Sequence, residues 1–154
     1  MHVVVLDNIR SVYNVGSIFR TANACGIGKV ILCGITPGPL DAKGRKRSDF
    51  AKVSLGAEEK VLWERSATTV DALQSLRDEG YYIVAIEQDS SSVDYKDVVA
   101  RSKTCFVLGS EVEGINKDVL SLCDVVAELP MLGSKESLNV TIAFGIASYR
   151  ILGI

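Results

Sequence analysis

The sequence VVVL at residues 3–6 is followed by NVGSIFRTANAC at residues 14–25 and, after Gly26, by VILC at residues 30–33. Apolar runs this short are typical of strands that are buried on both faces. Glycine commonly follows the end of a helix because it adopts the left-handed conformation easily. The stretch therefore predicts a strand, a helix and a second strand, which is the unit from which parallel sheets are built.

The same alternation continues along the chain. Residues 81–86, 105–108 and 125–129 are further strand candidates, and residues 61–63 are a weaker one. Helical patterns cover residues 69–79, closed by Gly80, and residues 117–122. We therefore expect an α/β fold with a single doubly wound, mostly parallel sheet flanked by helices. Ligands of such folds bind in the loops beyond the carboxyl ends of the strands.

Length and composition indicate one folded domain over residues 1–154. The chain has 154 residues, of which 47% are hydrophobic and 23% charged, and this composition excludes a disordered or low-complexity protein. No apolar run reaches the roughly 18 residues that a membrane span needs. The first residues lack the basic segment and cleavage site of a secretory signal. We expect a cytoplasmic protein with no membrane partner.

The charge pattern leaves two interpretations of residues 36–52. The formal net charge is -2, so the chain as a whole does not indicate a polyanionic partner. Residues 36–52 nevertheless carry five cations and only two carboxylates. The segment is either a solvated loop or a mobile arm that binds nucleic-acid phosphates. The cations are Lys43, Arg45, Lys46, Arg47 and Lys52.

Cysteine and histidine usage gives no support for a metal site. The four cysteines form no CxxC pair, and His2 is the only histidine. A catalytic relay through histidine would require the terminal His2 to fold back into a site. The cysteines lie among apolar neighbours and are expected to be small buried hydrophobes.

The last segment, residues 138–154, contains Arg150 as its only charged residue, and its apolar residues would occupy nearly every face of a helix. A helix that is apolar all round must be buried on all sides. In a chain of this size we expect a second copy to cover its outer face, which predicts a homodimer. The alternative is a helix that is wholly internal to one chain.

Polar residues gather in a first cluster at residues 8–22. Asn14 can cap the helix that begins there, and Gly16 removes a side chain where another backbone or a substrate comes close. Arg20 lies six residues after Asn14 and projects at a different angle, so a shared site would need the loop or a partner chain to complete it. Without a substrate, Arg20 would be an ordinary surface or ion-pair residue.

Two further clusters follow strands. In residues 106–115, Gly109 ends a strand and lets a flat ligand approach the backbone, while Glu111 disfavours an anionic ligand. The cluster has neither GxGxxG nor a P-loop, and without a ligand it is an ordinary turn. In residues 129–140, Ser137 and Asn139 stand at the mouth of the apolar helix, where they are either site residues or caps.

In this order the three clusters resemble the motifs of the SpoU/TrmH family of RNA ribose methyltransferases, in the knotted SPOUT superfamily. The matches are Asn14-x-Gly16-x-x-x-Arg20-x-Ala22, then Gly109-x-Glu111-x-x-Gly114, then Pro130-Met131 followed by Ser137-Leu138-Asn139-Val140. The resemblance implies S-adenosyl-L-methionine as methyl donor, methylation of an RNA ribose 2′-hydroxyl, a dimer and a C-terminal trefoil knot. It covers nearly the whole chain, and tRNA is the substrate we favour over rRNA.

Site residues follow from the resemblance position by position. The catalytic arginine corresponds to Arg20, with Asn14, Glu111, Ser137 and Asn139 as neighbours. RNA contacts are expected from Arg10, Arg20, Lys43, Arg45, Lys46 and Arg47. The cofactor is expected among Ile86, Glu87, Leu108, Gly109, Gly114, Leu129, Met131, Gly133, Ser137 and Leu138.

Two other functions remain as alternatives. A catalytically inactive relative could bind RNA or act as a scaffold, although such a protein would be free to lose the residues that are intact here. A generic nucleotide-binding protein would need the glycine-rich phosphate loop that the sequence lacks.

Overall fold

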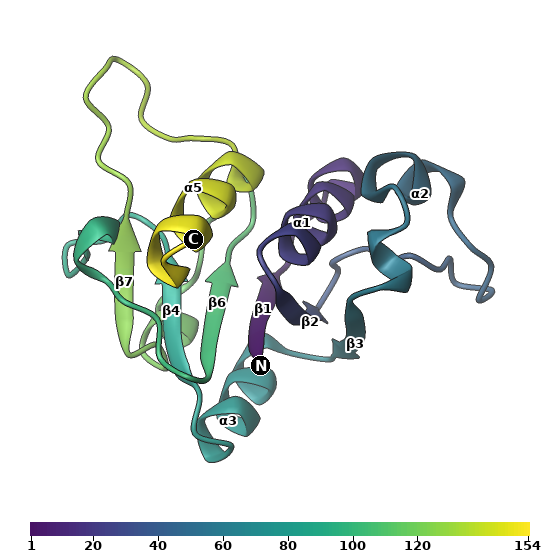
Figure 1. Ribbon diagram of the computed structural model, residues 1–154, viewed down its shortest axis with the longest axis horizontal. Coiled ribbons are helices and arrows are strands. Elements are labelled where there is room, and N and C mark those ends of the chain that lie inside the picture. The colour runs from purple at the N-terminus through teal and green to yellow at the C-terminus, as the bar shows by residue number, and fades with distance from the viewer.

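The computed structural model describes residues 1–154, and its seven strands form one sheet in which every neighbouring pair is parallel (Figure 1). The strand order is β3-β2-β1-β6-β4-β7-β5. The predicted α/β class and parallel sheet are confirmed. The strands are β1 (His2–Asp7), β2 (Ile27–Cys33), β3 (Leu62–Ser66), β4 (Tyr82–Ile86), β5 (Val93–Asp94), β6 (Thr104–Leu108) and β7 (Val125–Glu128).

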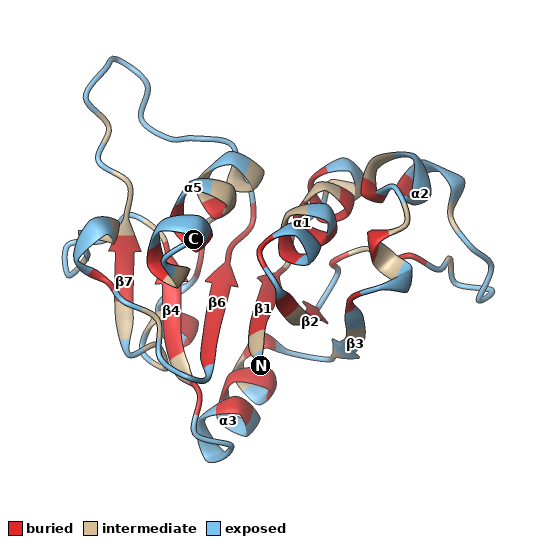
Figure 2. Cartoon of the chain, viewed as in Figure 1, coloured by how far each residue is buried: buried red, intermediate tan, exposed pale blue.

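Helices cover both faces of the sheet, so that the central strands β1, β6 and β4 lie buried between them (Figure 2). One face packs against α1, α2 and α5, and the other packs against α3 and α4. The helices are α1 (Val12–Ala24), α2 (Ser48–Ser54), α3 (Thr69–Asp78), α4 (Lys117–Leu120) and α5 (Val140–Leu152), with short 3-10 turns η1 (Ala57–Glu59) and η2 (Tyr95–Asp97).

The strength of each apolar signal follows the burial of its strand. All of residues 3–6 in β1 are fully buried, as expected for a strand with helices on both faces. The weak candidate at residues 61–63 corresponds to β3, which forms an edge of the sheet and exposes most of its side chains. Its weak pattern therefore reflects its edge position.

The first helix begins before the predicted residue. Ser11 is its cap, because the Ser11 side chain accepts a hydrogen bond from the N–H of Asn14. The prediction that Asn14 caps this helix is wrong, since Asn14 lies inside the first turn and is buried. Gly16 does serve a close approach: a Cβ there would lie 3.1 Å from Val53 Cβ on α2.

The basic segment at residues 36–52 is partly helical, which its sequence did not predict. Residues 48–54 form α2, and Phe50 is fully buried against Phe19 of α1, with ring centroids 5.3 Å apart at an edge-to-face angle. The predicted loop therefore ends at Arg47. Because Phe50 packs α2 against α1, the C-terminal end of the basic loop at residues 43–47 is held in place.

The C-terminal helix α5 is buried on one side only. Phe144 packs edge-to-face on Phe106 of β6, with ring centroids 6.1 Å apart, whereas Ile142 and Ile146 remain 53% and 42% exposed. The alternative of a wholly internal helix is wrong for the single chain. Asn139 caps the helix by accepting a hydrogen bond from Thr141 N–H. The homodimer and the knot stay predictions.

The cysteines and acidic residues form no metal cluster. Cys25, Cys33 and Cys105 are buried and Cys123 is half-buried, and all four are free thiols. No group of three or more His, Cys, Asp or Glu side chains could hold a metal ion. None of the helices has the length and apolar character that crossing a bilayer requires.

Phe144→Ala tests how α5 is attached to the sheet. Because the ring is fully buried, we expect a loss of about 3–5 kcal/mol in the free energy of unfolding, measured by urea denaturation. Leu62→Ala, at an exposed position on β3, is the control and should change stability by no more than about 0.5 kcal/mol. A similar small loss for Phe144→Ala would show that α5 is not held by this contact.

Candidate functional site

A cavity of about 690 Å³ opens beyond the carboxyl ends of β4, β6 and β7 and is closed on one side by the start of α5. Ligands of open parallel sheets bind beyond the carboxyl ends of the strands. Its walls are half apolar. The lining residues are Ile86, Glu87, Gln88, Asp89, Leu108, Gly109, Ser110, Glu111, Val112, Glu113, Gly114, Ile115, Lys117, Leu120, Leu129, Met131, Ser137, Leu138, Asn139, Val140 and Ala143.

All the residues predicted to bind the cofactor line this cavity, with the exception of Gly133. Several lining residues were not predicted as cofactor residues, among them Gln88, Asp89 and Lys117. The position of Gln88 and Asp89 directly after a buried strand was the available signal. Gln88 Nε2 also donates to the carbonyl of Glu136 at 3.0 Å, which ties the loop after β4 to the loop before α5.

Glycines let two segments of the cavity wall pass close to each other. A Cβ at Gly109 would lie 2.5 Å from the carbonyl carbon of Gly114. Gly109 is therefore required by its own neighbouring backbone, and the predicted approach of a flat ligand is not needed to explain it. Gly114 has a φ of +66°, and a Cβ there would lie 2.6 Å from Glu87 Oε2. That Glu87 oxygen accepts the N–H of Ile115 at 3.1 Å.

Glu111 joins the loop after β6 to the segment that begins α1. Its Oε2 accepts the N–H of Arg10 at 3.1 Å, and its Oε1 accepts the N–H of Ser11 at 3.2 Å. The Oε1 atom also accepts a hydrogen bond from Asn14 Nδ2 at 2.9 Å. Both carboxylate oxygens are thus engaged by segments about a hundred residues earlier in the chain.

Asn14 extends this contact to α5. Its Oδ1 accepts a hydrogen bond from Asn139 Nδ2 at 3.4 Å, while Asn139 Oδ1 caps α5. The structure therefore brings three of the predicted catalytic residues, Glu111, Asn14 and Asn139, into one hydrogen-bonded chain. Ser137 lines the same cavity from the exposed loop before α5.

The hydrogen bonds to Glu111 favour its charged form. Partial burial disfavours ionisation, but the hydrogen bonds from the Asn14 amide and from the N–H of Arg10 and Ser11 outweigh it. The pKa of Glu111 is lowered as a result. Glu111 is thus a carboxylate at neutral pH.

Arg20 lies outside the cavity. It is exposed on α1, does not line the cavity and takes part in none of the ion pairs of the chain. Arg10 is likewise exposed and unpaired, on the loop that Glu111 holds. Within a single copy of the chain, Arg20 does not reach the predicted cofactor residues.

The basic loop before α2 lies at the far end of the molecule from the cavity (Figure 1). Most of its cations are paired: Arg45 with Asp41 at 2.8 Å, Lys46 with Glu59 at 2.7 Å and Arg47 with Asp49 at 2.9 Å. Of the four predicted RNA-binding residues in this loop, only Lys43 has a side chain without an ion pair.

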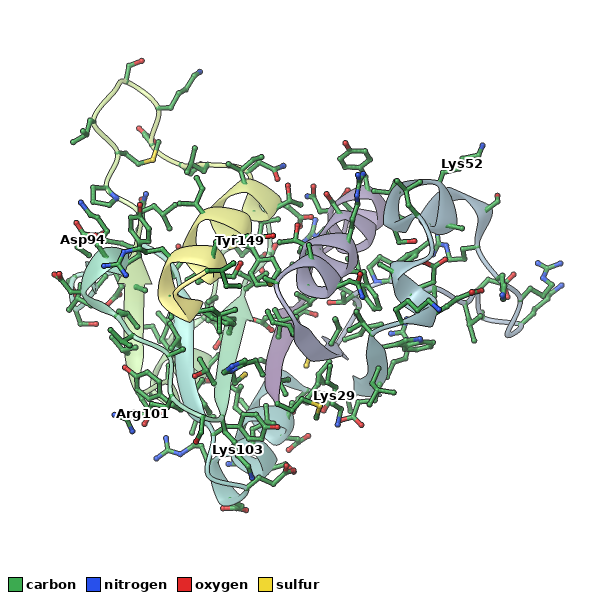
Figure 3. All side chains as sticks on the ribbon, viewed as in Figure 1. Lys29, Lys52, Asp94, Arg101, Lys103 and Tyr149 are labelled. Atoms are coloured by element: carbon green, nitrogen blue, oxygen red, sulfur yellow. The ribbon has the colours of Figure 1, made fainter.

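Three further cations, labelled in Figure 3, lie outside both the cavity and the basic loop. Lys52 extends from α2 into solvent, whereas Arg101 and Lys103 lie at the opposite end of the sheet from the cavity. Arg101 stacks there on the ring of Tyr82 at 4.0 Å. These two residues are too far from the cavity to contribute to it.

Comparisons with known proteins agree with the fold. The model of the SpoU rRNA Methylase family matches residues 1–149. A candidate TrmH family tRNA/rRNA methyltransferase of Staphylococcus haemolyticus (strain JCSC1435) is 32% identical over 149 residues, which cover 97% of this chain and 57% of that protein. The chain thus spans little more than half the length of this curated relative.

Solved structures give the same result. The AdoMet-bound rRNA methyltransferase of Sinorhizobium meliloti matches with a TM-score of 0.87 and 28% identity, over 97% of this chain and 55% of that chain. The TrmH/SpoU tRNA modifying enzyme of A. aeolicus matches with a TM-score of 0.84 and 26% identity, over 97% and 73%. The sequence match, the parallel sheet and the motif residues around its cavity lead to one conclusion: the chain belongs to the SpoU rRNA methylase family.

Proposed function

We propose that this protein is an S-adenosyl-L-methionine-dependent RNA methyltransferase that modifies a ribose 2′-hydroxyl, with tRNA as its substrate, in the cytoplasm. The observation that carries the proposal is the cavity at the carboxyl ends of β4, β6 and β7, with Glu111 and Asn139 of the motifs on its wall. Family membership supports an RNA substrate, and the AdoMet-bound relative supports the cofactor.

The cavity suits this cofactor in size, polarity and charge. Apolar side chains such as Leu108, Leu129 and Leu138 can enclose an adenine, while backbone groups of the loops can bind its edge and the ribose. Four carboxylates face the cavity with one lysine: Glu87, Asp89, Glu111 and Glu113 against Lys117. This excess of negative charge matches a sulfonium and an ammonium group. When bound, the cofactor supplies a methyl group that its sulfonium already activates, so the residues need hold no metal.

The reaction requires that the 2′-oxygen be aligned with the methyl group and lose its proton. A guanidinium stays protonated in proteins, so Arg20 does not act as the base. Its role is to bind the adjacent phosphate through its planar fork and to stabilise the developing alkoxide. A phosphate oxygen or another acceptor then takes the proton.

A second copy of the chain would complete the site. Arg20 lies outside its own cavity, and α5 exposes Ile142, Ile146 and Tyr149, of which Tyr149 is labelled in Figure 3. Burying this apolar face against a partner is favourable. A homodimer through the C-terminal helix region would cover α5 and could bring the Arg20 of one copy to the cavity of the other.

RNA would be bound first by the free cations beside the site. Arg10 and Arg20 are exposed and unpaired, whereas Arg45, Lys46 and Arg47 must exchange their carboxylate partners for phosphates. Such exchange at exposed ion pairs costs little. Binding should weaken steeply with salt, because the contacts are electrostatic.

Glu111 acts in this scheme by positioning. Its two oxygens already accept hydrogen bonds from Arg10 N–H, Ser11 N–H and the Asn14 amide, and its lowered pKa makes it a weak base. A group with this environment holds the start of α1 in place and does not take the proton of the 2′-hydroxyl.

Titration calorimetry with S-adenosylhomocysteine tests the cofactor cavity. We expect micromolar binding to a dimer identified by light scattering, followed by methyl transfer to total tRNA. Gly109→Ala should weaken binding, because its Cβ would meet Gly114 at 2.5 Å. Leu62→Ala is the control, since Leu62 is exposed on β3 and lies outside the cavity. A folded dimer that binds no cofactor would favour an RNA-binding scaffold instead.

Arg20→Ala tests the transition-state role of the guanidinium. We expect kcat for methyl transfer to fall by about 10²-fold or more, with S-adenosylhomocysteine affinity unchanged. Arg20→Lys keeps the charge but loses the fork, and should recover only part of the rate. Turnover by Arg20→Lys close to that of the wild type would remove the need for bidentate binding.

Glu111→Gln tests the positioning role through stability. Since the pKa of Glu111 is lowered from its ordinary value of 4.5, the carboxylate stabilises the fold above about pH 4.5 and loses this effect as pH falls through the folded-state pKa. We expect the free energy of unfolding to fall by about 1 kcal/mol at pH 7 and by less towards acid pH. Thermal unfolding at a series of pH values measures this difference. Glu113→Gln, on the same loop, is the control: Glu113 is exposed and its carboxylate accepts no hydrogen bond, so the change at pH 7 should be no more than about 0.5 kcal/mol. A constant difference for Glu111→Gln at every pH would contradict the assignment.

A further inference from the structure

One face of α1 carries an exposed aromatic ring in line with Arg20. Tyr13, Ser17 and Arg20 follow one another at intervals of four and three residues, which places them on the same side of a helix. Tyr13 and Arg20 are exposed and Ser17 is half-buried. Seven residues correspond to about 10 Å along the helix axis. Ser17, the residue between them in this series, has a small side chain.

Tyr13 has no partner within the chain that would explain it. Its side chain is 66% exposed, which makes it the most exposed of the five tyrosines. It belongs to neither core cluster and to neither aromatic pair. The adjacent residue, Asn14, is by contrast buried and hydrogen-bonded. The chain thus holds a large flat ring in solvent beside a buried site residue.

The backbone that carries Tyr13 is held rigidly. Ser11 caps the helix through the N–H of Asn14, and Glu111 accepts the N–H groups of Arg10 and Ser11. Since Glu111 also lines the cavity, these hydrogen bonds fix the backbone before Tyr13 relative to the cavity rim. A base that stacks on the ring therefore has to order only the side-chain torsions of Tyr13, because the helix that carries it is already formed.

The surroundings of the ring favour RNA over other ligands. Arg10 lies three residues before Tyr13 and Arg20 seven residues after it, and both are exposed cations without an ion pair. Aromatic rings between free cations are the arrangement that binds single-stranded nucleic acid: the rings stack on bases and the cations hold phosphates. Bases within a duplex are already stacked on each other and offer no free face.

We infer that Tyr13 is a stacking platform for an unpaired base of the substrate RNA, next to the nucleotide whose phosphate Arg20 binds. The inference rests on the proposed function and extends it, because it makes the substrate a single-stranded or looped RNA segment. The ring would stack on the base, Arg10 would bind a phosphate on one side, and Arg20 would bind a phosphate on the other.

Steady-state methyl transfer to total tRNA by Tyr13→Ala and Tyr13→Phe tests this inference. Tyr13→Ala should raise KM for tRNA about tenfold or more, with kcat changed far less, because stacking contributes to binding. Tyr13→Phe keeps the ring and should lie within about twofold of the wild type, since stacking needs no hydroxyl. Leu62→Ala is the control: Leu62 is 65% exposed, nearly as much as Tyr13, but lies on the edge strand β3.

A competition measurement distinguishes binding through stacked bases from binding through phosphates alone. Excess single-stranded 12-nucleotide RNA should inhibit the wild type more than the same strand in a duplex, and Tyr13→Ala should lose most of this difference. The titration with S-adenosylhomocysteine and the light-scattering mass should be the same for wild type and Tyr13→Ala.

Three results would overturn the inference: an unchanged KM for Tyr13→Ala, a Tyr13→Phe variant as defective as Tyr13→Ala, or an altered dimer mass, which would assign Tyr13 to the subunit interface. Failure of the proposed function gives a different result, because the wild type would then neither bind S-adenosylhomocysteine nor methylate tRNA.

Discussion

The Glu111 carboxylate holds together the parts of the chain on which the site depends. It accepts hydrogen bonds from the N–H groups of Arg10 and Ser11 and from the Asn14 amide, and Asn14 in turn contacts Asn139 at the cap of α5. The loop after β6, the start of α1 and the start of α5 are therefore fixed by one network.

The parallel sheet makes this network possible. In the strand order, β6 lies between β1 and β4, and β4 lies next to β7. Because all pairs are parallel, the carboxyl ends of these strands lie at one edge, and the loops that follow them meet there. Glu87 after β4 and Glu111 after β6 use this proximity in the same way, each accepting a backbone N–H of another loop.

Local patterns in the sequence predict the elements better than their contacts. Six of the seven strands and α3 are recognisable because their apolar residues and Gly80 report burial and helix ends directly, whereas β5, with two residues, is too short to show a pattern and was not predicted. The cap of α1 is not, since Ser11 and Asn14 are both good caps and only the distant Glu111 decides that Asn14 turns away. Likewise, α2 is hidden in a basic segment because its burial depends on one ring, Phe50. The carboxylates that neutralise Arg45, Lys46 and Arg47 could not be paired by sequence alone.

The cavity wall and helix α1 carry opposite charge, and this difference separates the proposed cofactor site from the proposed RNA site. The cavity wall carries four carboxylates and one lysine, so it attracts a cationic cofactor and repels RNA phosphates. On the other side, α1 presents Arg10 and Arg20 without neutralising partners. An RNA strand bound along α1 would stay outside the cavity, and only its uncharged ribose hydroxyl could approach the acidic wall. In the proposed dimer these two regions would meet where α1 of one copy faces the cavity of the other.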